Sequence, residues 1–298
     1  MPSTTPAFTS SGRALPAATA LGAVALTVSD VDRARFFYES VIGLNSWRLE
    51  GGDVALGVVG DAPLVTLHGD PTAPPRDPHA TGLFHLAIVL PDRRALAHAL
   101  LRLAQARHPL SGASDHLVSE ALYLADPDGN GIELYRDRPR DQWRREPDGT
   151  LTMATLRLDL AELAAELDGA GEPAPHAPAG TRVGHVHLQV ADIATAETFY
   201  HGILGFDVTV RTYPGALFVS AGGYHHHVGL NTWNSQGAAA PDPAAVGLRS
   251  YEIILPDREA LDAVLARIAA AGLVAEPVAD HGTLVRDPSG NAVLLRSR

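Results

Sequence analysis

The stretch LGAVALTVSDVDRARFFYESVIGL (21–44) recurs in outline as VGHVHLQVADIATAETFYHGILGF (183–206). Each begins with β-branched and other apolar residues, which is typical of a strand. Each then passes through an Asp into a helical pattern that carries an aromatic pair and ends at Gly. The Asp is a natural helix N-cap, because its carboxylate accepts hydrogen bonds from unpaired N–H groups of the first turn. Both stretches therefore predict a strand followed by a helix.

The same plan occurs twice more, in GLFHLAIVLPDRRALAHALLRLAQA (82–106) and GLRSYEIILPDREALDAVLARIAAAG (247–272). Strand-like runs follow every helical segment, and the second and fourth copies end in the similar hairpins DPDGNGIELYRD (126–137) and DPSGNAVLLRSR (287–298). The repeating unit is therefore β-α-β-β-β, present four times. The capping residues are Asp30, Asp92, Asp192 and Asp257.

Composition excludes several classes of function. The 298 residues carry a net charge of −11, and because an acidic surface repels phosphate and anionic lipid, we expect no nucleic-acid or membrane partner. The absence of cysteine excludes disulfide and thiolate chemistry. No apolar run approaches the roughly 20 residues that span a bilayer, and the first residues lack the apolar core of a signal peptide. We expect a cytoplasmic protein.

The distances between the capping residues divide the chain into two tandem pairs of modules joined by an insert. In the insert, the amphipathic LRLDLAELAAELDG precedes the Pro- and Ala-rich EPAPHAPAG, which is typical of a linker. The expected segments are a disordered tail (1–20), a first domain (21–137, modules 21–80 and 81–137), a helical and Pro/Ala-rich linker (138–182), and a second domain (183–298, modules 183–240 and 247–298).

The chain resembles the vicinal oxygen chelate superfamily of glyoxalases, bleomycin-resistance proteins and extradiol dioxygenases. The resemblance rests on the four modules, on HVHLQVADI with its later Phe–Tyr pair, and on DPDGNGIELY. The segments GLFHLAIVLPDR, SEALYLADPDGNGIELYRDRPR and SAGGYHHHVGLNTW are most similar to bacterial two-domain catechol 2,3-dioxygenases. The resemblance covers nearly all of residues 20–298. It implies an α+β fold in which the four β-α-β-β-β modules pair into two curved, cleft-forming sheets.

In that superfamily a divalent metal lies between two facing modules and is bound by residues of their first and last strands. The equivalent positions here are Ala23, His85, His185 and Ser250 in the first strands, and Thr66, Glu133, Gly229 and Leu294 in the last strands. The resemblance therefore implies a metal bound by His85, Glu133 and His185, with Fe(II) expected and Mn(II) as the alternative. His187 stays an alternative ligand, because it shares a strand face with His185.

The distribution of these ligands predicts how the modules pair. If modules paired in sequence order, neither half of the chain would hold all three ligands. We therefore predict that the second and third modules form one cleft within a single chain; a swapped dimer is the alternative, and a homodimer is left open. The outer pair is predicted to hold no metal among Ala23, Thr66, Ser250 and Leu294, with Tyr251 in its core.

Three further residues are candidates for catalysis. His227 is two residues before Gly229 and is expected to face the cleft as an acid–base residue. His116, in SDHLVSEALYL, is a second acid–base or substrate-binding candidate, and Tyr135, two residues after Glu133, is expected on the same strand face. Alternatively, His227 belongs to a histidine run at a surface hairpin without a catalytic role, and Tyr135 only forms part of the pocket wall.

The reaction implied by the resemblance is extradiol cleavage of a catechol-type aromatic diol by O₂. Two other functions remain open. A glyoxalase-type metal-dependent isomerase or lyase usually has a fourth protein ligand, whereas the fourth position here is Gly229. A non-catalytic binding protein of the bleomycin-resistance type needs no complete set of three ligands.

Overall fold

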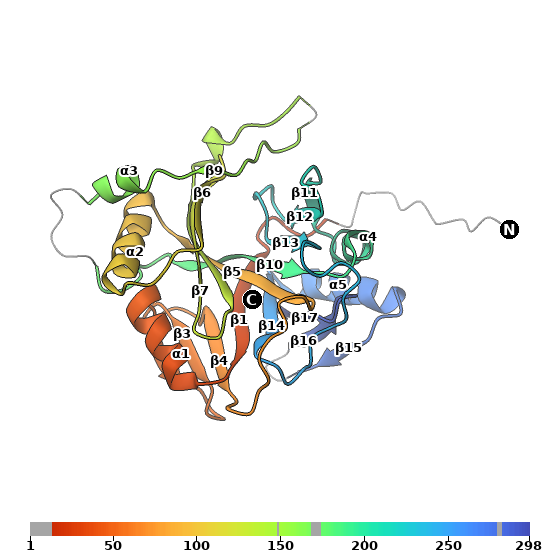
Figure 1. Ribbon diagram of the computed structural model, residues 1–298. Coiled ribbons are helices and arrows are strands. Elements are labelled where there is room, and N and C mark those ends of the chain that lie inside the picture. Colours follow the sequence, from red (N-terminus) through yellow and green to blue (C-terminus); the bar gives the residue numbers. More distant parts are fainter. Residues whose placement is uncertain (1–13, 148, 168–173, 279–281) are drawn as a thin grey trace.

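The computed structural model describes residues 14–147, 149–167, 174–278 and 282–298. Its strands form two mixed sheets, with helices packed beside them (Figure 1). Each sheet is built from two modules, and the modules are those that the repeat predicts. The α+β class and the two curved sheets are confirmed.

The second and third modules and the insert form the nine-stranded sheet. The second module contains β5 (Gly82–Leu90), α2 (Arg93–Gln105), β6 (Gly112–Asp115), β7 (Ser119–Ala125) and β8 (Gly131–Asp137). The third contains β10 (Arg182–Gln189), α4 (Ile193–Glu197) with a π-helical continuation (Thr198–Leu204), β11 (Asp207–Val210), β12 (Ala216–Ser220) and β13 (Val228–Asn231). With β9 (Leu156–Arg157) of the insert, the strand order is β11-β12-β13-β10-β5-β8-β7-β6-β9.

The first and fourth modules form the eight-stranded sheet. The first contains β1 (Ala20–Val28), α1 (Val31–Phe37) with a π-helical continuation (Tyr38–Ile42), β2 (Asn45–Arg48), β3 (Val54–Gly57) and β4 (Val65–Gly69). The fourth contains β14 (Gly247–Leu255), α5 (Arg258–Ala270), β15 (Ala275–Pro277), β16 (Thr283–Arg286) and β17 (Ala292–Ser297). Their order is β15-β16-β17-β14-β1-β4-β3-β2.

The modules pair out of tandem order within one chain. β5 of the second module runs antiparallel to β10 of the third, and β1 of the first runs antiparallel to β14 of the fourth. The predicted pairing of the inner modules is therefore confirmed. Each sheet combines strands from both predicted domains, 21–137 and 183–298. The division of the chain into those two domains stays a prediction.

The predicted capping residues begin the helices as expected. Oδ1 of Asp30 accepts a hydrogen bond from the backbone N of Arg33 at 2.9 Å, and Oδ1 of Asp92 accepts one from Ala95 N at 2.8 Å. Asp192 and Asp257 make the equivalent bonds. A carboxylate at this position satisfies an N–H group that has no partner within the helix.

The DPxGN turns join the two sheets. Oδ1 of Asp126 accepts hydrogen bonds from two backbone N–H groups of its own turn, and Tyr38 of the first module donates its hydroxyl to Asp126 at 3.3 Å. In the other half, Tyr200 donates to Asp287 at 3.0 Å in the same way. Tandem modules therefore contact each other between the sheets, which gives a structural role to the Tyr of the first and third modules and to the turn of the second and fourth.

The equivalent positions of the outer pair of modules lie on adjacent strands of the eight-stranded sheet. Thr66 and Ser250 both pair with Ala25 in adjacent strands. Next to them, Glu252 accepts a hydrogen bond from the backbone N of Ala23 and forms an ion pair with Arg296 at 3.0 Å. Tyr251 is fully buried in the main hydrophobic core, as predicted.

Two segments differ from the expectation. Residues 14–20 do not belong to a disordered tail, because the buried Leu15 donates its backbone N–H to Gly205 O at 2.8 Å; residues 1–13 lie outside the described part of the chain. In the insert, the start of the amphipathic stretch forms β9 instead of helix and pairs with β6. Only Leu160–Ala165 is the helix α3, and residues 168–173 of the predicted linker lie outside the described residues.

The helices in the described part of the chain are too short or too polar to cross a membrane.

Candidate metal site and pocket

The site is built from two rows of residues that run across adjacent strands of the nine-stranded sheet. Residues paired directly across strands share a face. Ala87 of β5 pairs with His185 of β10 on one side and with Glu133 of β8 on the other. His85, two residues before Ala87, points to the same face because side chains alternate along a strand. The small side chain of Ala87 leaves the space between the two rings and the carboxylate.

His85, Glu133 and His185 converge on one point. Nε2 of each histidine lies 3.0 Å from Oε2 of Glu133, and the two Nε2 atoms lie 3.4 Å apart. A metal about 2.1 Å from each atom, with the ligands at right angles, requires ligand atoms about 3 Å apart. Within the described residues, this is the group whose ligand atoms are close enough together to hold a metal.

Burial and the contacts within the triad together set the protonation states of Glu133 and His185. Burial raises the pKa of the Glu133 carboxyl, but the interactions with His185 and His85 outweigh it and hold the pKa well below its usual range. Burial lowers the pKa of His185 to about 4. A carboxylate and neutral imidazoles are the forms that bind a metal ion, since a proton on the ligand atom competes with the metal.

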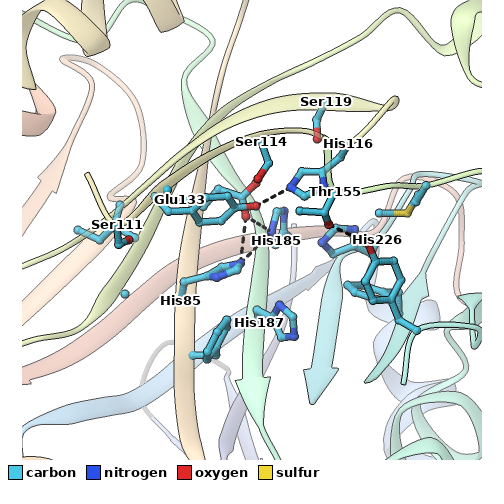
Figure 2. A pocket seen from close by; sticks show the side chains of 18 of the residues that line it. His85, Ser111, Ser114, His116, Ser119, Glu133, Thr155, His185, His187 and His226 are labelled. Atoms are coloured by element: carbon cyan, nitrogen blue, oxygen red, sulfur yellow. Dashed lines mark hydrogen bonds and ion pairs between the residues drawn. The ribbon is translucent and has the colours of Figure 1, made fainter. Parts of the chain in front are cut away.

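The triad lies in the wall of a cavity of about 370 Å³. Figure 2 shows His85, Glu133 and His185 pointing toward one another, with Thr155 and His226 on one side of them and Ser111 on the other. Apolar and aromatic side chains make up much of the remaining lining: Phe84, Leu124, Ile132, Met153, Tyr213, Phe218 and Trp233. A concave, mostly apolar pocket with a few convergent polar groups is typical of a small-molecule site.

The second row contains His85, His187 and Gly229. His187 pairs with His85 on one side and with Gly229 on the other. A Cβ on Gly229 would meet ring atoms of His187 at 3.0 Å, so a side chain at this position would require that ring to move. His187 lines the cavity, but its nitrogen atoms are not among the three converging atoms. The geometry therefore favours His185 over His187 as the ligand.

His116 lies beside the site, as expected. Its Nε2 is 2.7 Å from the hydroxyl of Tyr123, and its Nδ1 is 2.7 Å from the carbonyl of Ala154. Burial, and then the carboxylate of Glu133, raise the pKa of Tyr123 well above its usual range, so the phenol stays protonated. Tyr123 was not predicted, although the hairpin register reveals it: the turn pairs Ala125 with Gly131, which places Tyr123 opposite Glu133.

The prediction that His227 faces the cleft is wrong, and His226 takes that place. His226 lines the cavity and its ring centroid lies 4.0 Å from that of His185. His227 points into the body of the third module, where its Nδ1 accepts a hydrogen bond from the backbone N of Ala221 at 3.2 Å. Strand β13 begins only at Val228, so the alternation of side chains along the strand does not extend back to the histidine run.

Tyr135 lies behind His185 and is not part of the cavity lining. Its hydroxyl is 2.7 Å from that of Tyr224, and its ring centroid is 5.0 Å from that of His185. The ring of His185 is thus packed between Tyr135 and His226. Tyr135 occupies the predicted strand face, but it contacts the side chain of His185 and does not reach the cavity.

Behind the cavity, His225 and Asp137 continue the polar contacts of His226. Nδ1 of His226 lies 2.8 Å from Nδ1 of His225, and Nε2 of His225 lies 2.9 Å from Oδ1 of Asp137. The side chain of His225 is fully buried, whereas that of Asp137 is 23% exposed. A chain of hydrogen-bonding groups therefore leads from the cavity toward the surface. Sequence reasoning missed this chain, because it follows from the irregular backbone before β13.

Comparisons with known proteins agree with this architecture. The family model of the Glyoxalase/Bleomycin resistance protein/Dioxygenase superfamily matches residues 20–134 and 182–295. Catechol-2,3-dioxygenase of Bacillus subtilis (strain 168) is 43% identical over 283 residues, which cover 93% of this chain and 96% of that protein.

Solved structures share the fold at low sequence identity. A proposed dioxygenase from Bacillus subtilis matches with a TM-score of 0.66 at 15% identity, over 93% of this chain and 84% of that one. Glyoxalase I from Zea mays matches with a TM-score of 0.56 at 16% identity, over 93% and 92% of the two chains. With both halves matched by the family model and a relative at 43% identity, the chain belongs to the glyoxalase/bleomycin resistance protein/dioxygenase superfamily.

Proposed function

We propose that the protein is a metal-dependent extradiol dioxygenase that cleaves a catechol-type aromatic diol with O₂. The convergence of His85, Glu133 and His185 at the wall of an apolar cavity carries the proposal. Two imidazoles and one carboxylate on one side of an ion leave other coordination positions free for substrate and O₂. The likeness to a catechol-2,3-dioxygenase over nearly the whole chain supports a dioxygenase-type enzyme.

The three ligands would hold Fe(II), or Mn(II) as the alternative, whose ligand preferences overlap. When bound, such an ion supplies sites for both diol oxygens and for O₂ and conducts electrons from the ring to O₂. Both oxygen atoms enter the product, and the ring opens beside the diol to a semialdehyde that carries a carboxylate. The chain itself must place the ring, accept a proton from the diol and exclude water.

His226 is the proposed proton acceptor. It lines the cavity, and burial lowers its pKa well below its usual range, so the imidazole is neutral before substrate binds. The same shift makes it a weak base, so it would accept a proton from a diol whose acidity a bound metal ion raises. The contact of His226 with His225, and of His225 with Asp137, provides a path for that proton toward solvent. His116 and Tyr123, which belong to the β6–β7 hairpin, form a second polar pair that could bind a diol oxygen.

The open alternatives predict different outcomes in one set of assays. Purified protein is reconstituted with Fe(II) or Mn(II), its metal content is measured, and O₂ uptake is followed with catechol; the product should have the mass of the substrate plus two oxygen atoms. Isomerisation of a thiol–aldehyde adduct without O₂ uptake would instead identify a glyoxalase-type enzyme. Stoichiometric ligand binding with neither reaction would identify a sequestering protein.

A further inference from the structure

Part of the cavity wall comes from the insert between the tandem module pairs. Met153, Ala154 and Thr155 line the cavity, whereas the match to the family model stops at residue 134 and resumes at residue 182. This part of the wall therefore lies outside the modules that the superfamily shares, and we call residues 153–155 the insert wall.

The insert wall is attached to both modules of the cleft. On the second module, the carbonyl of Ala154 contacts Nδ1 of His116 at 2.7 Å. On the third module, Oγ1 of Thr155 lies 2.7 Å from the hydroxyl of Tyr213. The insert wall is therefore joined to both modules that form the cavity, and Figure 2 shows Thr155 beside the triad, near His116 and His226.

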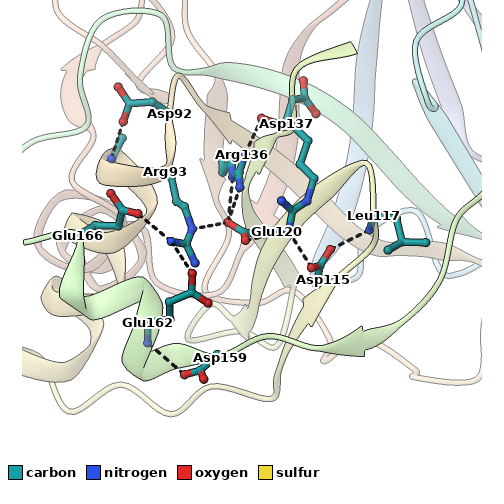
Figure 3. A network of polar contacts seen from close by, with 12 residues as sticks. Asp92, Arg93, Asp115, Leu117, Glu120, Arg136, Asp137, Asp159, Glu162 and Glu166 are labelled. Atoms are coloured by element: carbon teal, nitrogen blue, oxygen red, sulfur yellow. Dashed lines mark hydrogen bonds and ion pairs between the residues drawn. The ribbon is translucent and has the colours of Figure 1, made fainter. Parts of the chain in front are cut away.

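Ion pairs hold the following part of the insert in place. Strand β9 pairs with β6 directly after Thr155, and Glu166, at the end of α3, pairs with Arg93 of α2 at 2.7 Å. Arg93 also forms an ion pair with the buried Glu120, and Glu120 forms a second ion pair with Arg136 (Figure 3). The path of residues 153–155 is therefore fixed by their own contacts with His116 and Tyr213 and by the anchored segment that follows them, so their side chains form a shaped wall.

The insert wall is apolar where it meets the third module. Met153 packs with Tyr213 against a small hydrophobic cluster that includes Phe218. Trp233 and Phe84, whose ring centroids are 5.4 Å apart, add aromatic surface to the same cavity. A diol ring at the triad fills only part of the roughly 370 Å³, and the remaining space is lined by groups that favour an apolar substituent.

Away from the triad, which would hold the metal ion, the described cavity lining offers no fixed positive charge to an anionic substituent. Among the described residues that line it, none is arginine, and Glu133 is the carboxylate; the whole chain contains no lysine. A carboxylate on the substrate would lose its water without gaining a cationic partner, which is costly in an apolar site.

We propose that the insert wall, through Met153, selects uncharged catechols that carry an apolar alkyl or aryl substituent. The inference rests on the proposed function, because the triad is taken to hold the diol end of the substrate. It adds the chemical class of the rest of the substrate and the residue that recognises it.

The first experiment compares substrates on the metal-loaded wild-type protein. The probes are catechol, 3-propylcatechol, 4-propylcatechol and 3,4-dihydroxybenzoate, with kcat/KM from O₂ uptake and Kd from calorimetry without O₂. At least one propylcatechol should exceed catechol by about tenfold in kcat/KM, which is the size of effect that buried methylene groups produce. The dihydroxybenzoate should be weaker than catechol by on the order of a hundredfold.

The second experiment changes the wall. Met153→Arg should raise the ratio of kcat/KM for 3,4-dihydroxybenzoate to that for the better propylcatechol by about tenfold or more, because it supplies the missing cation. Leu156→Arg is the matched control: it places the same charge three residues later on an exposed strand position that does not line the cavity. Met153→Gln, which keeps the size and adds no charge, should lower the preference for propyl groups without improving the carboxylate.

The outcomes separate the inference from the proposed function. Equal Kd values for 3,4-dihydroxybenzoate and the propylcatechols would contradict the proposed selectivity of the insert wall. The same change in the ratio of kcat/KM values in Met153→Arg and Leu156→Arg would contradict it too. In both cases O₂ uptake would still support the dioxygenase. If the Kd values have the expected order but no O₂ is consumed, the selectivity of the insert wall is supported and the proposed dioxygenase activity is contradicted.

Discussion

The Nε2 atoms of His85 and His185 lie 3.4 Å apart although the two residues are 100 positions apart in sequence. They come from first strands of different tandem pairs, which meet because β5 and β10 are antiparallel neighbours. Glu133 of the parallel neighbour β8 completes the triangle at 3.0 Å from each. The single chain thus contains the whole candidate metal site, and no exchange of modules between two chains is needed to assemble it.

Removing the carboxylate should abolish metal binding without unfolding the protein. We expect Glu133→Ala to weaken metal affinity by more than about a hundredfold, since even groups that only support a ligand contribute about 10–100-fold, and to lose O₂ uptake with catechol. Metal content after desalting and circular dichroism check both statements. Glu252→Gln removes a carboxylate of the outer pair of modules that pairs with Leu294, the position equivalent to Glu133, and this variant should keep its metal. Retention of a full equivalent of metal by Glu133→Ala would place the site elsewhere.

Adjacent histidines should differ in their effect on the reaction. His226→Asn removes the proposed proton acceptor, so kcat should fall by about 10²–10⁴-fold, the usual contribution of an acid–base group, while metal content stays unchanged. His227→Asn should alter kcat by no more than a few-fold, because His227 does not line the cavity and an Asn oxygen can replace its Nδ1 as the acceptor for Ala221 N. Similar decreases of kcat in His226→Asn and His227→Asn would contradict the assignment of His226 as the proton acceptor.

His227 should instead contribute to the pH dependence of stability. Burial lowers its pKa to about 3, below the roughly 6.5 of an unfolded histidine. A base with a lowered folded pKa stabilises the fold above its unfolded pKa, and this contribution is lost as the pH falls from about 6.5 toward the folded value. Between pH 8 and pH 5 the loss is about 2 kcal/mol.

Urea denaturation of the metal-free protein at those two pH values measures this loss. His227→Asn should lose about 2 kcal/mol less free energy of unfolding than the wild type, because Asn does not titrate. The other buried histidines, including His185 with its pKa of about 4, contribute equally to both proteins and cancel in the comparison. Identical pH dependence in the two proteins would show that His227 keeps an ordinary pKa.

The missing fourth ligand position should be intolerant of any side chain. Gly229→Ala places a Cβ 3.0 Å from the ring of His187, and overpacking of this kind costs about 1–3 kcal/mol. Gly202→Ala is the control, because nothing lies within 4 Å of its Cβ position and Ala is favoured over Gly in a helix by roughly 0.5–1 kcal/mol. Thermal unfolding of both variants measures the difference; equal melting temperatures would show that the strand shifts freely at Gly229.

The resemblance to the superfamily indicated which strand positions hold a metal, and the periodicity of the repeat located those positions in this chain. The capping residues set a common register for all four modules, and counting seven residues back from Asp92 and Asp192 identifies His85 and His185. Strand alternation and the shared hairpin do the same for Glu133. These inferences succeeded because regular strands and helices have fixed periods, so a position within one module has the same place in every other.

Only the tertiary structure decided which groups surround the triad. His226 replaced His227 because the backbone before Val228 is irregular, where alternation no longer predicts direction. Tyr135 has the expected strand face, yet packing against His185 and Tyr224 buries it outside the cavity. Met153 and Thr155 belong to an insert without a repeat, and their place in the cavity wall comes from contacts with residues far away in sequence. Local periodicity carries no information about such long-range contacts, which depend on how whole elements pack.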